Sequence, residues 1–346
     1  MKTKISCLLL SVLLAGSAAF SETTENSKNM SAKNRKKIVV SVLGPAPLKE
    51  KPADNQQAVD RMIAHWKKQI APVLPDRPDL IVLPEACDRF PAQSMEERKA
   101  YYKFRGNTIR DFFCEVAKEN HCYIAYSAAR RMDDGTYRNS TQLIDRNGKI
   151  AGIYNKNHLV PHETTEGGIL CGKDAPIFKT DFGTVAMAIC FDLNFDELLE
   201  KYAKQRPDLI IFSSMYHGGL MQNYWAYHCR SYFVGAIAGN ECTVVNPVGE
   251  KIAHSTDYFS RITTEINLDF KVVHLDENWG KLDAVKAKYG RGVTIFDPGH
   301  VGAVLLTSNM EDVTSDDIIS EFQIETWDEY YDRSMRHRHT PGNMEP

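Results

Sequence analysis

Short apolar runs alternate with amphipathic segments along the chain from residue 37 onward. Runs rich in Val, Ile and Leu predict strands, and they lie at residues 37–43, 79–85, 121–130, 137–145, 149–155, 184–190, 208–214, 242–248, 251–255 and 261–268. Apolar residues spaced three or four apart predict helices at residues 53–74, 95–120, 195–204 and 222–236. This alternation favours a single α/β domain with helices on the outside of sheets.

The run at residues 184–189 delivers a thiol, Cys190, to the point where its strand must end and a polar turn begins. The carboxyl end of a strand is where open α/β sheets place their chemistry, because it is rigid and faces a crevice. The turn that follows can offer backbone N–H groups to a developing oxyanion. Cys190 is therefore a candidate nucleophile, and the alternative is a core cysteine that packs as a small apolar side chain.

Two further polar residues follow strand-like runs. Glu85 comes after D-L-I-V-L-P, and Lys156 lies just after the predicted hairpin strand at residues 149–155. Taken alone, Glu85 suits a turn cap and Lys156 suits a solvated surface position. Together with Cys190 they can do more, because a desolvated carboxylate can take and return the thiol proton and an ammonium can stabilise an oxyanion. The three residues predict a cysteine hydrolase whose base is a carboxylate.

These segments resemble the nitrilase superfamily of carbon–nitrogen hydrolases. The matching pieces are D-L-I-V-L-P-E-A around Glu85, N-K-N-H-L-V-P-H-E around Lys156 and A-I-C-F-D-L-N-F-D-E around Cys190, in the family's order. The resemblance covers about residues 37–268 and implies a four-layer α-β-β-α sandwich that pairs through its helices. It also implies that Glu85 is the general base, Lys156 the oxyanion stabiliser and Cys190 the nucleophile. The backbone N–H of Phe191 would be the second oxyanion donor.

The family often carries a further glutamate a few residues after its lysine, which orients the lysine and touches substrate. Glu163 fits that spacing best, and Glu166 is the alternative. One pattern departs from the family. Members commonly show Arg-Ala-x-Glu-Asn on the helix after the D-L-I strand, whereas this chain keeps only the arginine in R-S-Y-F-V at residues 230–234. The departure bears on helix packing and substrate contacts and leaves the three catalytic candidates intact.

The residues after Cys190 bear on the reaction. Family members that hydrolyse nitriles typically continue with Trp-Glu, whereas this chain continues with Phe-Asp, which favours hydrolysis of a small amide to a carboxylic acid and ammonia. Leu193-Asn194 stands where N-carbamoyl hydrolases often place an arginine for a substrate carboxylate. Nearby aromatic residues predict a pocket for a neutral or weakly polar amide: Phe191, Tyr216, His217, Tyr224 and Trp225. The alternative is that these aromatics are core or dimer contacts.

Other activities stay open at this point. Hydrolysis of a nitrile or an N-carbamoyl group, and acyl transfer to an amine in place of water, would use the same three residues. A different class of cysteine hydrolase would draw on other cysteines and on histidine bases, namely Cys87 or Cys229 with His158, His217 or His228. It explains neither the carboxylate nor the order of the motifs. The alternative outside enzymes is a secreted binding protein that keeps the fold without turnover.

Charge and cysteine content bear on partners and cofactors. The formal net charge is -3, with both signs interspersed, which gives no electrostatic footprint for nucleic acid. Without Cys7 the cysteines are odd in number, so at least one thiol should stay unpaired in an oxidising compartment. No Cys/His cluster has zinc spacing, and Pro161 interrupts the pair His158 and His162. We therefore expect no metal, no cofactor and a small-molecule amide as the substrate.

Residues 1–21 follow the three-part pattern of a secretory signal peptide. Early lysines precede a mostly apolar stretch from Ile5 to Ala15, and small residues follow it. The apolar stretch is too short for a stable membrane span, so we expect cleavage near Ser21 and an exported product, periplasmic or extracellular. An uncleaved anchor is the alternative. Residues 22–36 are polar and predict a flexible leader.

Residues 37–310 are assigned to the hydrolase domain, and residues 311–346 to a C-terminal extension of different character. The extension is acidic first, then aromatic with Phe322, Trp327, Tyr330 and Tyr331, and finally basic. A helix that presents so many aromatics must bury them, so we expect them at a subunit interface of a homodimer or higher oligomer. The alternative is a C-terminal helix that closes the core of its own domain.

Overall fold

The computed structural model describes residues 36–346. The predicted signal peptide, residues 1–21, and all but the last residue of the predicted leader, residues 22–36, lie outside the described residues. Export therefore stays a prediction. In the part of the chain that the structure describes, no helix is both long enough and apolar enough to cross a membrane.

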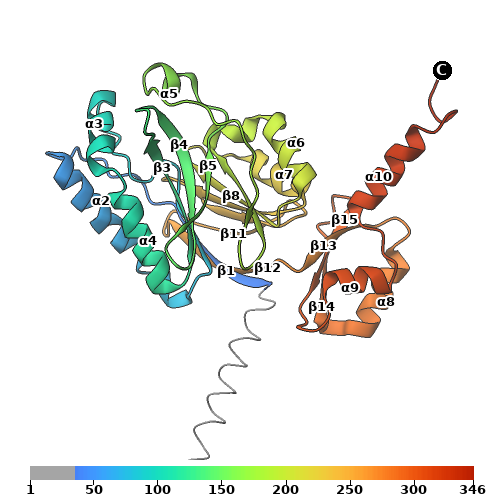
Figure 1. The fold of residues 1–346 in the computed structure, drawn as a ribbon. Helices are drawn as coiled ribbons and strands as arrows, with labels where there is room; N and C mark the ends of the chain where they lie inside the picture. The colour runs from blue at the N-terminus through green and yellow to red at the C-terminus, as the bar shows by residue number, and fades with distance from the viewer. Residues whose placement is uncertain (1–35) are drawn as a thin grey trace, which may run out of the picture. The chain divides into compact units, whose positions relative to one another are not determined.

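Two six-stranded sheets carry the fold (Figure 1). The first has the order β12-β1-β2-β3-β4-β5, with bounds β1 Lys37–Leu43, β2 Leu80–Val82, β3 Tyr123–Arg131, β4 Tyr137–Ile144, β5 Ile150–Asn155 and β12 Arg261–Asn267. The second has the order β11-β10-β9-β8-β7-β6, with bounds β6 Phe178–Lys179, β7 Thr184–Ile189, β8 Leu209–Ser214, β9 Tyr232–Ile237, β10 Thr243–Val245 and β11 Lys251–His254. Each sheet has a parallel centre, β1-β2-β3 and β7-β8-β9, flanked by antiparallel strands.

The two sheets face one another, and helices cover their outer faces (Figure 1). On the first sheet lie α2 (Asn55–Ile70), α3 (Met95–Arg105) and α4 (Thr108–Asn120). On the second lie α6 (Asp196–Gln205) and α7 (Leu220–Cys229). The predicted four-layer α-β-β-α sandwich is confirmed.

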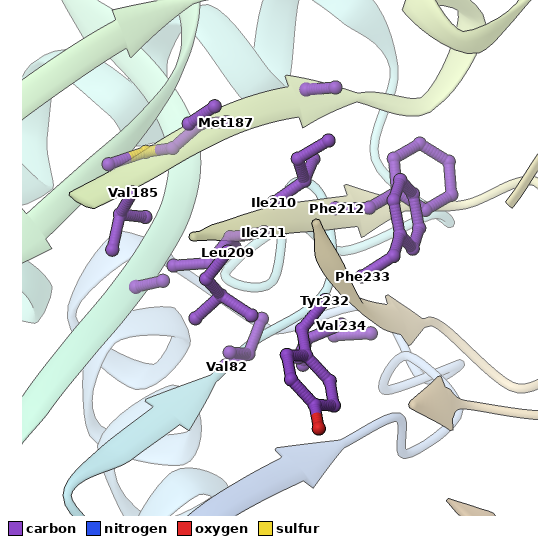
Figure 2. Close-up of a cluster of buried hydrophobic side chains, with 14 of the residues drawn as sticks. Val82, Val185, Met187, Leu209, Ile210, Ile211, Phe212, Tyr232, Phe233 and Val234 are labelled. Carbon is purple, nitrogen blue, oxygen red and sulfur yellow. The ribbon is translucent and has the colours of Figure 1, made fainter. Parts of the chain in front are cut away.

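Alternate residues of the central strands face different layers, which explains why their sequences are continuously apolar. Leu80 and Val82 of β2 join the core between the sheets, whereas Ile81 between them packs with the helices. Figure 2 shows Val82 in one apolar cluster with side chains of β7, β8 and β9, among them Met187 and Val234. This dense core holds in place the strand ends that carry the candidate site.

Two of the predicted helices differ from the observed elements. The segment at 95–120 forms two helices, because Gly106 takes a positive φ of 48° after α3 and interrupts the run. The helix predicted at 222–236 ends at Cys229, where Arg230 turns the chain with a φ of 56°. Residues 232–237 then form β9, and their aromatic and β-branched side chains suit a strand that is buried on both faces.

A third sheet begins at Phe270, well before the domain boundary predicted after residue 310. It has the order β13-β15-β14, and the elements of this region are β13 Phe270–His274, α8 Trp279–Tyr289, β14 Val293–Phe296, β15 Ala303–Ser308, α9 Ser315–Glu321 and α10 Trp327–Arg338. Val273, Leu306 and Ile318 belong to a separate apolar core. Residues 270–310 thus pack with the C-terminal helices, because their strands need α8 and α9 to cover an apolar face.

The aromatic residues of α10 find contacts within the chain. The Tyr330 ring stacks on His274 with ring centroids 3.6 Å apart, and the Arg230 guanidinium lies 5.2 Å from the centroid of the Trp327 ring. These contacts fit the alternative of a helix that packs on its own chain, whereas Tyr331 is 55% exposed. Association between subunits stays a prediction.

Candidate active site

Glu85, Lys156 and Cys190 line one cavity of about 210 Å³. Glu85 comes after β2, Lys156 directly after β5 and Cys190 directly after β7. Since β2 and β5 belong to the first sheet and β7 to the second, the packing of the two sheets brings the three side chains together. The cavity is smaller than the roughly 300–1,000 Å³ typical of sites for drug-sized ligands, so it suits a small substrate.

Lys156 lies between two carboxylates. Its Nζ donates to Glu85 Oε1 at 2.9 Å and to Glu163 Oε2 at 2.8 Å. The lysine side chain is only 1% exposed, so water screens these contacts little. Glu163 belongs to α5 (Pro161–Thr165), whereas Glu166, the alternative, is exposed. The structure thus places Glu163 beside the lysine.

Asn139 on β4 joins this cluster, although the sequence analysis did not single it out. Its buried Nδ2 donates to Glu85 Oε1 at 2.8 Å and to Glu163 Oε1 at 3.0 Å. The backbone N–H of Met215 donates to the second Glu85 oxygen at 3.0 Å. Together with the bond from Lys156, these contacts hold the Glu85 carboxylate in one orientation. The polar run Y-R-N-S-T-Q carries no signal for Asn139, because its partners come from other segments.

The contacts within the cavity set the protonation states. Burial by itself would raise the pKa of Glu85, but the charge of Lys156 and the hydrogen bonds from Lys156 and Asn139 outweigh it and lower that pKa. Burial by itself would lower the pKa of Lys156, but the neighbouring carboxylates and the Cys190 sulfur outweigh it and raise that pKa. Burial and the Glu85 carboxylate raise the pKa of Cys190 to about 12. The resting cavity therefore holds a carboxylate, an ammonium and a neutral thiol.

The backbone at Cys190 is constrained. Cys190 opens the short 3-10 helix η2 (Cys190–Asn194) with a φ of 50°, a left-handed value that is uncommon outside glycine. Asp192, two residues further on, is fully buried. Its Oδ2 accepts a bond from the backbone N–H of Ile189 at 3.0 Å. This bond links the end of β7 to η2 and helps to hold the turn that presents the thiol.

The same carboxylate reaches the lysine segment. Asp192 accepts from the Tyr154 hydroxyl at 2.7 Å and from the backbone N–H of His158 at 2.8 Å. Tyr154 and His158 lie two residues before and after Lys156. One buried carboxylate therefore ties the turn of the candidate nucleophile to the segment of the candidate oxyanion stabiliser.

Asp192→Ala is expected to destabilise the protein by about 3 kcal/mol, because it leaves several buried donors without an acceptor. We also expect kcat to fall at least about tenfold, since Cys190 and Lys156 lose a shared anchor. Urea unfolding and steady-state kinetics measure the two effects. Asp283→Ala, which removes an exposed acid of α8, is the matched control. Equal stability and rate for both variants would show that the turn holds its shape without Asp192.

The predicted aromatic pocket is not found at this cavity, since none of its five residues lines the cavity. Trp225 is buried in the core and Tyr224 is 40% exposed, because α7 covers the outer face of the second sheet. Phe191 packs edge-on against another phenylalanine of the same segment. Tyr216 and His217 pack against each other just after β8. The prediction of a neutral, aromatic substrate pocket therefore has no support in this cavity.

The wall of the cavity comes instead from the segment after β2, from α3, from β3 and β4, and from the region of α5. Its apolar or aromatic members are Ala86, Met95, Tyr102, Ala129, Tyr137, Val160, Ile169 and Met215. Its basic members other than Lys156 are Arg89, Arg98, Lys99 and His162. Sequence reasoning did not assign these basic residues to the site, and the pattern around Arg98 and Lys99 of α3 is that of an ordinary solvated helix.

The other candidate nucleophiles lie outside the cavity. Cys229 is fully buried, and burial raises its pKa to about 12. Burial also raises the pKa of Cys87 far above the usual range of a thiol. All seven cysteines between residues 36 and 346 are free thiols. Within the same residues, no three His, Cys, Asp or Glu side chains are placed to hold a metal ion.

Residues 40–248 match the model of the carbon-nitrogen hydrolase family. The chain belongs to this family. The match includes Glu85, Lys156 and Cys190 and runs from β1 to the segment after β10. This carbon-nitrogen hydrolase is therefore an enzyme that acts on carbon–nitrogen bonds other than peptide bonds, and the predicted membership of the nitrilase superfamily is confirmed.

Three relatives show the extent of the similarity. This hydrolase is 28% identical over 211 residues to the "Hydrolase in agr operon" of Staphylococcus lugdunensis, and the alignment covers 55% of this chain and 88% of that protein. It is 25% identical over 209 residues to the omega-amidase NIT2 of Homo sapiens, and that alignment covers 54% of this chain and 70% of the relative. The crystal structure of Saccharomyces cerevisiae Nit3, a member of branch 10 of the nitrilase superfamily, superposes with a TM-score of 0.56 at 19% identity. The superposition covers 74% of this chain and 96% of Nit3. The structural likeness shows the fold.

Proposed function

We propose that this hydrolase is an exported amidase that cleaves a small amide to a carboxylic acid and ammonia. Cys190 is the nucleophile, Glu85 the base and Lys156 the stabiliser of the oxyanion. The observation that supports this proposal is the 2.9 Å contact between Lys156 and Glu85 beside the Cys190 thiol in one small cavity. The omega-amidase among the relatives and the Phe-Asp pair after Cys190 support an amide over a nitrile.

Acylation begins when substrate enters. Glu85 takes the thiol proton while the Cys190 sulfur attacks the amide carbonyl carbon, which gives a tetrahedral intermediate with an oxyanion. The neutral resting thiol makes this proton transfer necessary, and Glu85 lines the same cavity as the thiol, whose pKa its charge raises. The Lys156 ammonium stabilises the oxyanion. The N–H of Phe191, in the first turn of η2 where no intrahelical acceptor exists, is the second donor.

The end of acylation and the deacylation that follows return every group to its starting state. Glu85 passes its proton to the leaving nitrogen, the carbon–nitrogen bond breaks, and ammonia leaves a thioester on Cys190. A water molecule then gives a proton to Glu85 and attacks the thioester carbonyl. The carbon–sulfur bond breaks, the carboxylic acid departs, and the proton on Glu85 returns to the Cys190 sulfur. Glu163 and Asn139 hold the Lys156 and Glu85 side chains in position through acylation and deacylation.

The test is ammonia release by the purified protein from a panel of short primary amides, nitriles and N-carbamoyl compounds of matched chain length. We expect ammonia from amides at rates at least about a hundredfold above those from the matched nitriles. Added hydroxylamine reports acyl transfer, because a thioester that accepts amines yields a hydroxamate. Turnover of nitriles or N-carbamoyl compounds with no turnover of any amide would contradict the proposal.

A further inference from the structure

The turn that carries Glu85 has a strained backbone. Ala86, the next residue, has a φ of 47°, a left-handed value that costs free energy in a residue other than glycine. Backbone bonds fix the chain on either side, since the N–H groups of Leu83 and Cys87 donate to carbonyls of β3 at 3.1 and 2.9 Å. Strained backbone persists only where its surroundings over-determine it. The turn therefore needs a further anchor.

A buried ion pair follows this turn. Asp88, three residues after Glu85, is fully buried, and its Oδ2 lies 2.8 Å from Nε of Arg105, the last residue of α3. Arg105 is buried as well, so water screens the pair little. The hydroxyl of Tyr126, on β3, donates to the same carboxylate oxygen at 2.7 Å. The segment of the base, the first sheet and α3 thus meet at one carboxylate.

The Arg105 guanidinium reaches the wall of the cavity. Its Nη1 donates to the carbonyl of Gly106 at 2.8 Å, and its Nη2 donates to the carbonyl of Ala129, on β3. It also lies 5.1 Å from the centroid of the Tyr102 ring. Ala129 and Tyr102 both line the cavity. One buried cation therefore ties the cavity wall to the carboxylate that follows the base.

Stability alone does not explain this pair. Buried ion pairs contribute little net stability, because desolvation offsets their attraction, and apolar side chains of similar volume often serve as well. Asp88 Oδ1 is buried without a hydrogen-bond partner in the described structure, which adds to the cost. Burial by itself would lower the pKa of Arg105, but the charge of Asp88 and nearby tyrosines outweigh it and raise that pKa. A full charge pair is thus kept in an apolar layer, and a role in the reaction gives the reason.

We propose that Asp88 and Arg105 are positioning residues that hold the Glu85 carboxylate within reach of the Cys190 thiol. Neither residue lines the cavity, so both act through the strained turn. The inference rests on the proposed role of Glu85 as the base. Asp88 is the counterpart of Asp192, the buried carboxylate that anchors the turn of the nucleophile.

Asp88→Ala is expected to lower kcat for ammonia release about a hundredfold per folded molecule, with KM changed by less than about threefold, because a misplacement of about 1 Å in a reacting group costs a rate factor of this size. Arg105→Met should behave in the same way. Asp88→Asn keeps an acceptor for the Tyr126 hydroxyl and should restore part of kcat. Circular dichroism gives the folded fraction of each sample before the assay.

The pH dependence separates positioning from a direct effect of charge. Glu85 must be ionised to take the thiol proton. Burial by itself would raise the pKa of Glu85, but its contacts with Lys156 and Asn139 outweigh burial and lower that pKa. A displaced Glu85 loses those contacts, so the acid limb of kcat/KM should move to higher pH in both Asp88→Ala and Arg105→Met. Charge alone would move the limb to lower pH in Asp88→Ala, which removes an anion, and to higher pH in Arg105→Met.

Arg146→Met is the matched control, because it breaks a partly buried ion pair at the opposite end of β2. Arg146 Nη2 lies 2.8 Å from Asp79, the residue before that strand. We expect a lower melting temperature, with kcat per folded molecule and the acid limb unchanged. Unchanged kcat in Asp88→Ala, a loss of kcat in Arg146→Met equal to that in the two variants, or limbs that move in opposite directions would overturn the positioning role.

Two further measurements keep the proposal testable. If the parent protein hydrolyses no amide, the proposed function fails, and the rate of Cys190 labelling by iodoacetamide, followed by peptide mass, carries the same pH comparison without turnover. If Asp88→Ala does not fold, Tyr126→Phe takes its place. It removes one neutral hydroxyl from the carboxylate, so a shift of the acid limb to higher pH supports positioning and an unchanged limb overturns it.

Discussion

Cys190→Ala is expected to abolish amide turnover, with a loss of at least about 10⁴-fold in kcat, while the protein stays folded. The variant removes the one thiol among the described residues that line the cavity with Glu85 and Lys156. The other two sulfur atoms there are methionine thioethers, which are not nucleophiles at neutral pH. It deletes little volume, and Cys190 is only partly buried, so the cost in packing is small. Ammonia release and thermal unfolding measure the two halves of this prediction.

The matched control is Cys171→Ala, because Cys171 is an exposed free thiol outside the cavity. We expect its rate and melting temperature to equal those of the parent protein. Near-normal ammonia release by Cys190→Ala would show that another group is the nucleophile. A lost rate together with a collapsed melting temperature would leave the fold, and not the chemistry, as the explanation.

Lys156→Met is expected to lower kcat by several orders of magnitude and to destabilise the protein by about 3–5 kcal/mol at neutral pH. The rate falls because the oxyanion loses its cation. Stability falls because Glu85 remains as a buried carboxylate and Glu163 as a partly buried one, without the charge that now lies 2.9 and 2.8 Å away. Steady-state kinetics and urea unfolding measure the two losses.

The stability loss has a predicted pH dependence. In the parent protein the pKa of Glu85 is lowered, so its ion pair stabilises the fold above the pKa of the unfolded chain and is lost as pH falls through the folded pKa. Without Lys156, burial dominates and raises the pKa of Glu85 above its usual value. The free energy of unfolding of Lys156→Met should therefore be closer to that of the parent protein near pH 4 than near pH 7. Lys149→Met, an exposed lysine just before β5, should show neither effect, and a pH-independent loss in Lys156→Met would contradict this account.

Sequence patterns located the strands and the three candidate residues well, for a local reason. A strand buried on both faces needs an unbroken apolar run, so β1, β2, β7 and β8 are recognisable in isolation. The residue at which such a run stops is equally visible, and Glu85 and Cys190 each stand just beyond one. Lys156 ends the hairpin in the same way. Chemistry then linked three strand ends that the sequence itself does not connect.

Local patterns failed where the outcome depended on a neighbour. Residues 232–237 read as the end of a helix, yet they form β9, because a place between β8 and β10 exists only once the second sheet is assembled. In this case tertiary packing outweighed local propensity. Trp327 and Tyr330 contact Arg230 and His274 within the chain, and the subunit interface expected for the aromatic segment stays a prediction.

The sequence alone determined the family, the layered fold and the three side chains at the strand ends, because each is encoded in a continuous run of residues. Only the tertiary structure decided which other side chains surround them. Asn139 reaches Glu85 across the first sheet, and Glu163 is chosen over Glu166 by the path of α5. The cations of α3 enter the cavity because that helix packs beside β3, a contact between distant segments that no local pattern encodes.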